Sequence, residues 1–135
     1  MEVIVCLDDY NGMLFNHRRQ SRDQAVITDI WKESKGRNLW IGSFSSVLFT
    51  EYMETIMVSD TPLGKAQRGD ICFIENLDLM PYEQNIEKII VYRWNRRYPA
   101  DIYLDIDLKN NWKMIFKTEF AGHSHKKITK EIYIK

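Results

Sequence analysis

Apolar residues occur in short runs separated by polar turns, and the form of each run predicts its secondary structure. Residues 3–7 and 71–74 are continuous apolar runs, which are typical of strands buried on both faces of a sheet. Further strands are expected at residues 38–41, 55–59, 88–94 and 102–108. Residues 128–134 alternate between apolar and polar positions, and with residues 112–120 they are expected to form a closing antiparallel pair.

One segment has helical periodicity instead. Its apolar stripe consists of Val26, Ile27, Ile30 and Trp31. This spacing puts the four side chains on one face of a helix. We expect the helix to begin at Ser21, which forms a capping-box pattern with Gln24, and to end at Gly36. A short helix is expected at residues 43–52, and a helix or turn at 77–85. Residues 13–20 are expected to form a loop, and residues 60–69 a turn-rich connection.

Strands that alternate with short helices indicate an α/β sheet. The chain has 135 residues, which corresponds to one domain spanning residues 1–135. Cys6 and Cys72 lie inside apolar runs, so we interpret them as small core residues. No apolar run is long enough to cross a bilayer, and the first residues lack the features of a signal peptide. We therefore expect a cytoplasmic protein.

Charge is balanced along the chain. Lys and Arg together number 19, as do Asp and Glu, which gives a net charge of zero. A neutral chain has no global field that would attract a nucleic acid. We therefore expect no nucleic-acid partner unless a local basic patch provides the attraction.

Four segments, taken in order, resemble the dihydrofolate reductase family and its riboflavin-pathway relatives. They are residues 3–12, with the Asn-Gly turn after a first strand; residues 38–42, a strand that ends in Gly; residues 71–94; and residues 112–135, which contain Trp112, Ser124 and His125. The resemblance implies a mixed, mostly parallel sheet flanked by short helices, with a C-terminal antiparallel hairpin. It also implies a pocket between the first strand, the loop that follows it and the first helix.

In this family, an acid at the start of the first helix binds the pterin and assists its protonation. Asp23 has the matching type and position, so the resemblance implies that Asp23 is the catalytic acid, with a pKa raised by burial. The other expected substrate-binding residues are Asp9, Met13, Ile27 and Trp31. A simpler interpretation of Asp23 is also open, because an acid in the first turn of a helix is favoured by the helix dipole.

The cofactor half departs from the family pattern. Where the family has Arg after a strand-ending Gly, this chain has Gly42 followed by Ser43. Where the family has a glycine pair beside the pyrophosphate, this chain has Glu75 and Asn76. The carboxylate of Glu75 would repel the cofactor's pyrophosphate, and two like charges ~4 Å apart repel by about 4 kcal/mol at an effective dielectric of 20. Residues 60–69 are also shorter than the family's adenine-site wall. Four positions match the family's cofactor-binding residues, and we predict them to be non-functional: Gly42, Ser43, Glu75 and Asn76.

Three further features allow more than one interpretation. Arg93, Trp94, Arg96 and Arg97 form a cation–aromatic cluster, which indicates either a partner surface or a strand end with Trp94 in the core. Acidic residues follow the cluster at once and would cancel a nucleic-acid patch. His123 and His125 are interpreted as part of a polar turn rather than a metal site, since two lysines follow them. We find no motif for Ser-His-Asp or Cys-His catalysis.

Two functional classes follow. The first is a protein of this fold that binds a pterin-like small molecule or a partner, has no resident cofactor and lacks conventional reductase activity. The alternative is a divergent, NADPH-dependent reductase that holds NADP differently. Fold resemblance cannot choose between them, because function depends on the site.

Overall fold

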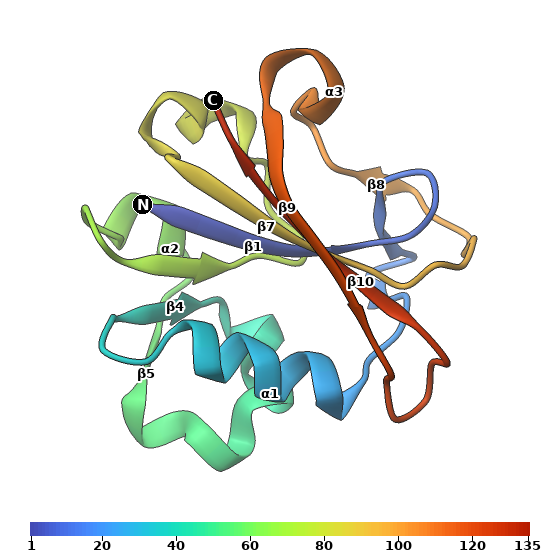
Figure 1. Ribbon diagram of the computed structural model, residues 1–135. Coiled ribbons are helices and arrows are strands. Elements are labelled where there is room, and N and C mark those ends of the chain that lie inside the picture. The colour runs from blue at the N-terminus through green and yellow to red at the C-terminus, as the bar shows by residue number, and fades with distance from the viewer.

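The computed structural model describes residues 1–135, and a seven-stranded sheet forms its centre (Figure 1). In spatial order its strands are β5 (Ile56–Val58), β4 (Leu39–Ile41), β6 (Ile71–Phe73), β1 (Glu2–Leu7), β7 (Lys88–Arg93), β10 (Ile128–Ile134) and β9 (Lys113–Phe120). The first five run parallel to one another, and β10 pairs antiparallel with both β7 and β9. The predicted mixed, mostly parallel sheet with a C-terminal antiparallel hairpin is confirmed.

Both faces of the sheet are covered, as the continuous apolar runs predict. Val3 and Val5 pack into one core cluster and Ile4 into the other, on the opposite face. The second cluster includes the helix α1 (Gln24–Glu33) and the 3₁₀ segment η1 (Ser43–Thr55). The first cluster includes residues of α2 (Pro62–Lys65) and α3 (Leu108–Asn111), and the 3₁₀ segment η2 (Met80–Asn85) packs beside it.

Helix α1 begins two residues later than the capping-box pattern predicts. Its N-cap is Asp23, whose side chain accepts a hydrogen bond from the Ala25 amide at 2.9 Å. The prediction of Ser21 as the cap is wrong, because a carboxylate nearer the helix satisfies the same free amides. The helix ends at Glu33, and Gly36 follows with a φ of 78°, the left-handed conformation that glycine tolerates.

Residues 13–20 do not form the expected loop. They form a hairpin of β2 (Gly12–Phe15) and β3 (Arg18–Arg19), which joins β8 (Ile102–Tyr103) in a second, three-stranded sheet. The two residues between β2 and β3, Asn16 and His17, both have positive φ, which is typical of the tight turns that join antiparallel strands. The prediction failed because this hairpin lacks alternating hydrophobicity.

The strand predicted at residues 102–108 is also mostly wrong. Only Ile102–Tyr103 is extended in a sheet, because the acids that follow bind main-chain amides instead. Asp105 accepts hydrogen bonds from the amides of Leu79 and Met80, and Asp107 caps α3. Within the predicted connection 60–69, four residues form the short helix α2. No helix in the structure combines the length and apolarity that a membrane span requires.

The core predictions for Trp94 and Cys72 are confirmed, since both side chains are buried. Cys6 is only partly buried, although it packs against the cluster that contains α1. Both cysteines are free thiols.

Candidate functional site

A small cavity lies between β1, the hairpin β2–β3 and the start of α1. Its free volume is about 20 Å³, which is room for about one water molecule. Its lining consists of Cys6, Met13, Arg19, Gln20, Ser21, Arg22, Asp23, Val26, Ile27, Leu48, Phe73, Glu75 and Trp94. Among the predicted substrate-binding residues, the structure brings together Met13, Asp23 and Ile27. Asp9 is exposed and outside the lining, and Trp31 stacks on Tyr52 with ring centroids 4.6 Å apart.

The carboxylate of Asp23 is fully occupied by donors from its own chain. Its Oδ1 accepts from the amides of Ala25 and His123, both at 2.9 Å. Its Oδ2 accepts from the amide of Ser124 at 2.8 Å and its hydroxyl at 3.1 Å, and it lies 3.0 Å from Nδ1 of His125. The Ser124 hydroxyl lies equally near the Arg22 carbonyl, and its single proton serves only one of the two. The other four donors already match the approximately four lone-pair positions of a carboxylate. This arrangement leaves Asp23 no acceptor for a ligand.

These contacts also decide the charge of Asp23. Burial raises its pKa, but hydrogen bonds from His123, His125, Ser124 and Ala25 together outweigh burial, so the pKa lies well below its usual value. The expectation of a raised pKa at Asp23 is therefore wrong. An acid that stays ionised at neutral pH is a poor proton donor. The structure places Asp23 as a charged anchor between α1 and the loop that joins β9 to β10.

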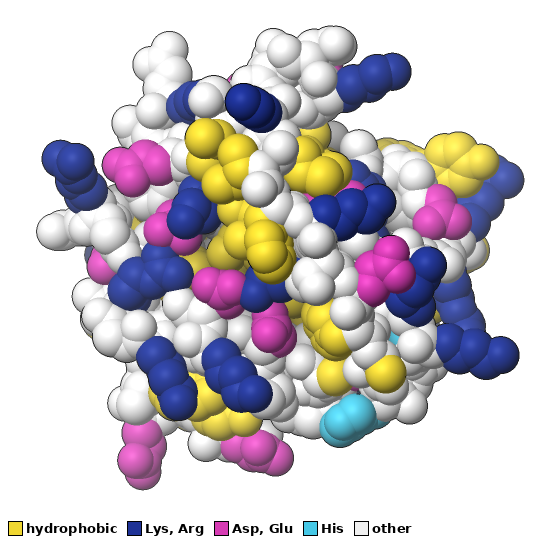
Figure 2. Space-filling model, in the orientation of Figure 1, with side chains coloured by type: hydrophobic (Ala, Val, Ile, Leu, Met, Phe, Trp, Pro, Cys, Tyr) yellow, Lys and Arg dark blue, Asp and Glu magenta, His cyan; other side chains and the backbone are white.

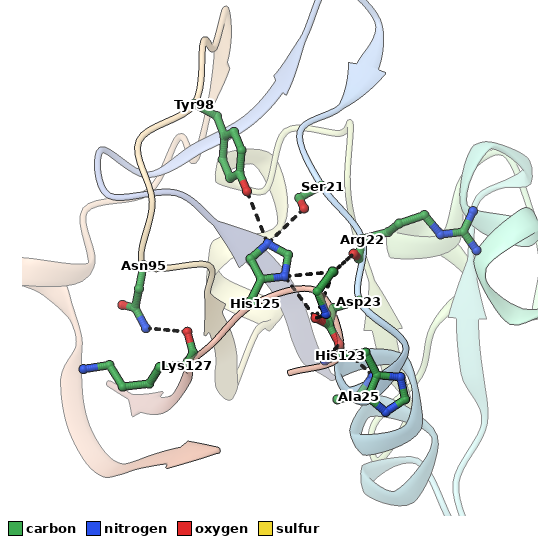
Figure 3. Close-up of polar contacts among 10 residues, drawn as sticks. Ser21, Arg22, Asp23, Ala25, Asn95, Tyr98, His123, His125 and Lys127 are labelled. Carbon is green, nitrogen blue, oxygen red and sulfur yellow. Dashed lines mark hydrogen bonds and ion pairs between the residues drawn. The ribbon is translucent and has the colours of Figure 1, made fainter. Parts of the chain in front are cut away.

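The imidazole of His125 extends the network from Asp23 to Ser21 and Tyr98 (Figure 3). Its ring stacks on Trp94 with centroids 4.7 Å apart, and the residue is 5% exposed. Its Nε2 lies 3.0 Å from the hydroxyl of Ser21 and 3.2 Å from that of Tyr98. Ionised Asp23 can only accept a hydrogen bond, so a neutral His125 ring carries its proton on Nδ1 and donates it to Asp23. Its Nε2 then accepts a hydrogen bond from a hydroxyl.

Sequence reasoning missed this network because its members are far apart. Ser21 and His125 are 104 residues apart, and no local motif joins them. The polar turn predicted around His125 is present between β9 and β10, but its imidazole is buried and points toward Ser21 and Tyr98 (Figure 3). No group of three or more His, Cys, Asp or Glu side chains forms a metal-binding arrangement.

On the other side of the cavity, Arg19 and Glu75 form a two-pronged ion pair. Nε and Nη2 of Arg19 each donate to a different oxygen of Glu75 at 2.9 Å. The hydroxyl of Ser45 donates to the same carboxylate at 2.7 Å. The charge of Glu75 is therefore neutralised within the chain, and the repulsion of about 4 kcal/mol estimated for an unpaired acid is an overestimate. The pair also fills space that a ligand would need.

The remaining matched cofactor positions lie at the surface around this pair. Gly42 precedes η1, and the hydroxyl of exposed Ser43 lies 3.3 Å from Asp60. Asn76 is exposed beside Glu75. The structure therefore places the Arg19–Glu75 ion pair at a position that the resemblance matches to the cofactor's pyrophosphate.

Only part of the predicted partner surface is available. Arg93 binds Glu131 at 2.9 Å and Asn11, and Trp94 is in the core. Arg96 and Arg97 are exposed, and the guanidinium of Arg97 lies 4.8 Å from the ring centre of Tyr10. On the face shown in Figure 2, basic and acidic side chains are interspersed. A partner surface at Arg96 and Arg97 stays a prediction.

Comparison with known proteins supports the fold independently. No protein-family model and no curated protein sequence matches the chain. Among solved structures, dihydrofolate reductase from Enterococcus faecalis, complexed with NADP(H) and RAB-propyl, is similar with a TM-score of 0.69 and 9% sequence identity. The match covers 98% of this chain and 94% of that one. The dihydrofolate reductase-like fold is thereby confirmed, while at this identity the likeness concerns the fold alone.

Proposed function

We propose that this chain, with its dihydrofolate reductase-like fold, binds a small pterin-like molecule at Glu75 and does not carry out conventional NADPH-dependent reduction. The carboxylate of Glu75 carries the proposal. It lines the cavity and holds a planar, two-pronged donor, the guanidinium of Arg19. Since Asp23 is saturated, Glu75 takes the role that the family resemblance gave to Asp23.

The guanidinium of Arg19 resembles the ligand that we propose. The amino group of a pterin and its neighbouring ring N–H present two parallel donors, as a guanidinium does. A pterin could therefore replace Arg19 on Glu75 without leaving the buried carboxylate unpaired. Withdrawal of Arg19 would also enlarge the cavity, which the closed pair reduces to about 20 Å³. The apolar side chains of Met13, Ile27 and Phe73 would then contact the rings.

The absence of conventional reduction is supported by the positions matched to the cofactor site. A pyrophosphate needs main-chain amides that it can approach closely, which is why glycines serve there. Side chains at Glu75 and Asn76 obstruct that approach, and Ser43 replaces the cation. Because Arg19 neutralises Glu75, the missing cation and the obstructed approach to the amides weaken cofactor binding more than charge repulsion does.

Thermal unfolding with and without ligand tests the proposal. A pterin or methotrexate at 100 times its dissociation constant should add about 2.7 kcal/mol of stability, which corresponds to a rise of roughly 10 °C in Tm. Glu75→Gln should abolish the shift, because a neutral amide presents a donor to the ligand's own donors. Asp9→Asn is the matched control, since Asp9 is exposed and outside the cavity lining.

Two results would overturn the proposal. One is the absence of any Tm shift with millimolar pterin or methotrexate. The other is a comparable shift with NADPH, together with pterin-dependent oxidation of NADPH, which would establish the divergent reductase instead. The Enterococcus faecalis enzyme was solved with NADP(H), so NADPH is the second ligand that this experiment must measure.

A further inference from the structure

We infer that Ser21, His125 and Asp23 form a nucleophilic relay that cleaves small carboxylic esters by acyl transfer to Ser21. The inference uses the cavity of the proposed function, but it does not depend on a pterin. The three side chains form one hydrogen-bonded chain, with 3.0 Å from Oγ of Ser21 to Nε2 of His125 and 3.0 Å from Nδ1 to Oδ2 of Asp23. A hydroxyl, a base and an acid that orients the base are recognised by this geometry, whatever their order in the sequence.

The base of the relay has the required tautomer. Asp23 accepts a hydrogen bond from Nδ1 of His125, so the lone pair of Nε2 faces the hydroxyl of Ser21. The ring is also held in place, because it stacks on Trp94. The loop that carries it is fixed by hydrogen bonds to Asp23 from the amides of His123 and Ser124, and the Ser124 hydroxyl lies beside the same carboxylate. A base whose orientation is fixed before reaction loses little entropy at the transition state. Figure 3 shows these side chains converging from two distant segments.

The nucleophile lies beside the cavity rather than inside the core. Ser21 lines the cavity and is partly exposed, whereas His125 and Asp23 behind it are buried. Ser21 and Arg22 immediately precede α1, and their main-chain amides donate to no main-chain acceptor. They lie ahead of the N-cap Asp23 and outside the helix, and a main-chain amide without an acceptor can donate to negative charge that develops beside it. They are the donors available to the oxyanion that forms when Ser21 attacks a carbonyl.

The step balances within the relay. Oγ of Ser21 bonds to the ester carbonyl carbon while its proton passes to Nε2 of His125. The tetrahedral intermediate then breaks its bond to the alcohol oxygen, which receives that proton and leaves. Water attacks the acyl-serine with His125 again accepting a proton, and the acid and free Ser21 are released. Because the cavity beside Ser21 is small, with a free volume of about 20 Å³, acetyl is the acyl group to test first.

Hydrolysis of p-nitrophenyl acetate by the full chain tests the inference. Ser21→Ala should lower kcat/KM by about 100-fold or more. After acid quenching, the wild-type protein should carry an acetyl group on Ser21, located by peptide mass spectrometry. Asp9→Asn should hydrolyse the ester at the wild-type rate. Unchanged thermal unfolding of Ser21→Ala would show that the loss is not a folding defect.

Asp23 is a positioning residue in this scheme, and its role needs a separate measurement. In the wild-type protein, imidazole nitrogen NMR should show His125 protonated at Nδ1. Asp23→Asn should shift the proton toward Nε2 and lower kcat more than it changes KM. A tautomer that stays the same while kcat falls would restrict Asp23 to a structural role and contradict the relay.

Three results would overturn the inference. They are full hydrolysis by Ser21→Ala, acetylation only at other residues, and loss of activity in Tyr98→Phe but not in Ser21→Ala, since Tyr98 is the other hydroxyl at Nε2. Pterin binding is measured separately by thermal shift in Ser21→Ala. Acylation without pterin binding would refute only the proposed function, and pterin binding without acylation would refute only the relay.

Discussion

Replacement of Asp23 by asparagine tests how much stability its buried carboxylate provides. Asparagine keeps the shape of the side chain and one carbonyl oxygen, so that oxygen can still accept hydrogen bonds from the amides of Ala25 and His123. Its NH₂ group, however, would face the donors that now converge on Oδ2, which come from Ser124 and His125. The hydroxyl and the imidazole can rearrange, but the Ser124 amide cannot.

The expected cost follows from these contacts. A buried donor without a partner costs about 1–3 kcal/mol, and each hydrogen bond to a charged group contributes about 1.5–3 kcal/mol. At the lower ends of these ranges, one orphaned amide and one or two lost charge-assisted bonds together cost about 2.5–4 kcal/mol. Urea unfolding at pH 7 measures this difference. Asp9→Asn, which changes an exposed acid, should remain within about 0.5 kcal/mol of the wild-type protein.

The pH dependence gives a second check on Asp23. Because the folded-state pKa lies below the unfolded value, the carboxylate stabilises the fold at every pH above about 3.9. That contribution falls as the pH drops below this value toward the folded-state pKa. The stability difference between wild type and Asp23→Asn should therefore shrink in acid. A difference below 1 kcal/mol at pH 7, or one that does not change with pH, would refute the reasoning.

Three further substitutions follow from single contacts. A Cβ at Gly122 would lie 2.5 Å from Asp23, so Gly122→Ala should destabilise the fold by roughly 2–3 kcal/mol in urea unfolding. Gly12→Ala should do the same, because its Cβ would lie 2.6 Å from each of two other side chains. Tyr92→Phe removes the hydroxyl that donates to Asp29 at 2.5 Å and should cost about 1–3 kcal/mol in the same assay.

The two glycine substitutions share one control. The nearest atom to a Cβ at Gly42 is the Ser59 carbonyl at 3.8 Å, which is ordinary contact. Gly42→Ala should therefore leave unfolding almost unchanged. If Gly42→Ala and Gly122→Ala destabilised the protein equally, the cost would come from general loss of glycine flexibility, and the proposed clash with Asp23 would be contradicted.

The two acids at the cavity show how the tertiary environment changes the meaning of a residue type. Asp23 matches the family's catalytic acid by sequence position, yet donors from within the chain occupy it. Glu75 matched a lost glycine, yet its carboxylate lines the cavity beside Arg19. In the function that we propose, the residue that binds the ligand is therefore one that the resemblance matched to the cofactor site.

The sequence by itself determined the sheet, its buried strands, helix α1 and the C-terminal hairpin. Hydrophobic periodicity reports which face of each element is buried, and that information lies within a few neighbouring residues. The same short range explains the failures at residues 13–20 and 102–108, where polar side chains decide the backbone path. Even the N-cap lies two residues from its predicted position, because Asp23, like Ser21, is a residue type that caps helices.

Only the tertiary structure decided the site. Ser21 meets His125 across 104 residues, and Arg19 meets Glu75 across 56. Such pairs depend on how the sheet orders its strands and on where each loop returns, which no local pattern encodes. The charge of Asp23 likewise depends on a loop 100 residues away. Fold class was therefore accessible from periodicity, whereas the chemistry of the cavity required the folded chain.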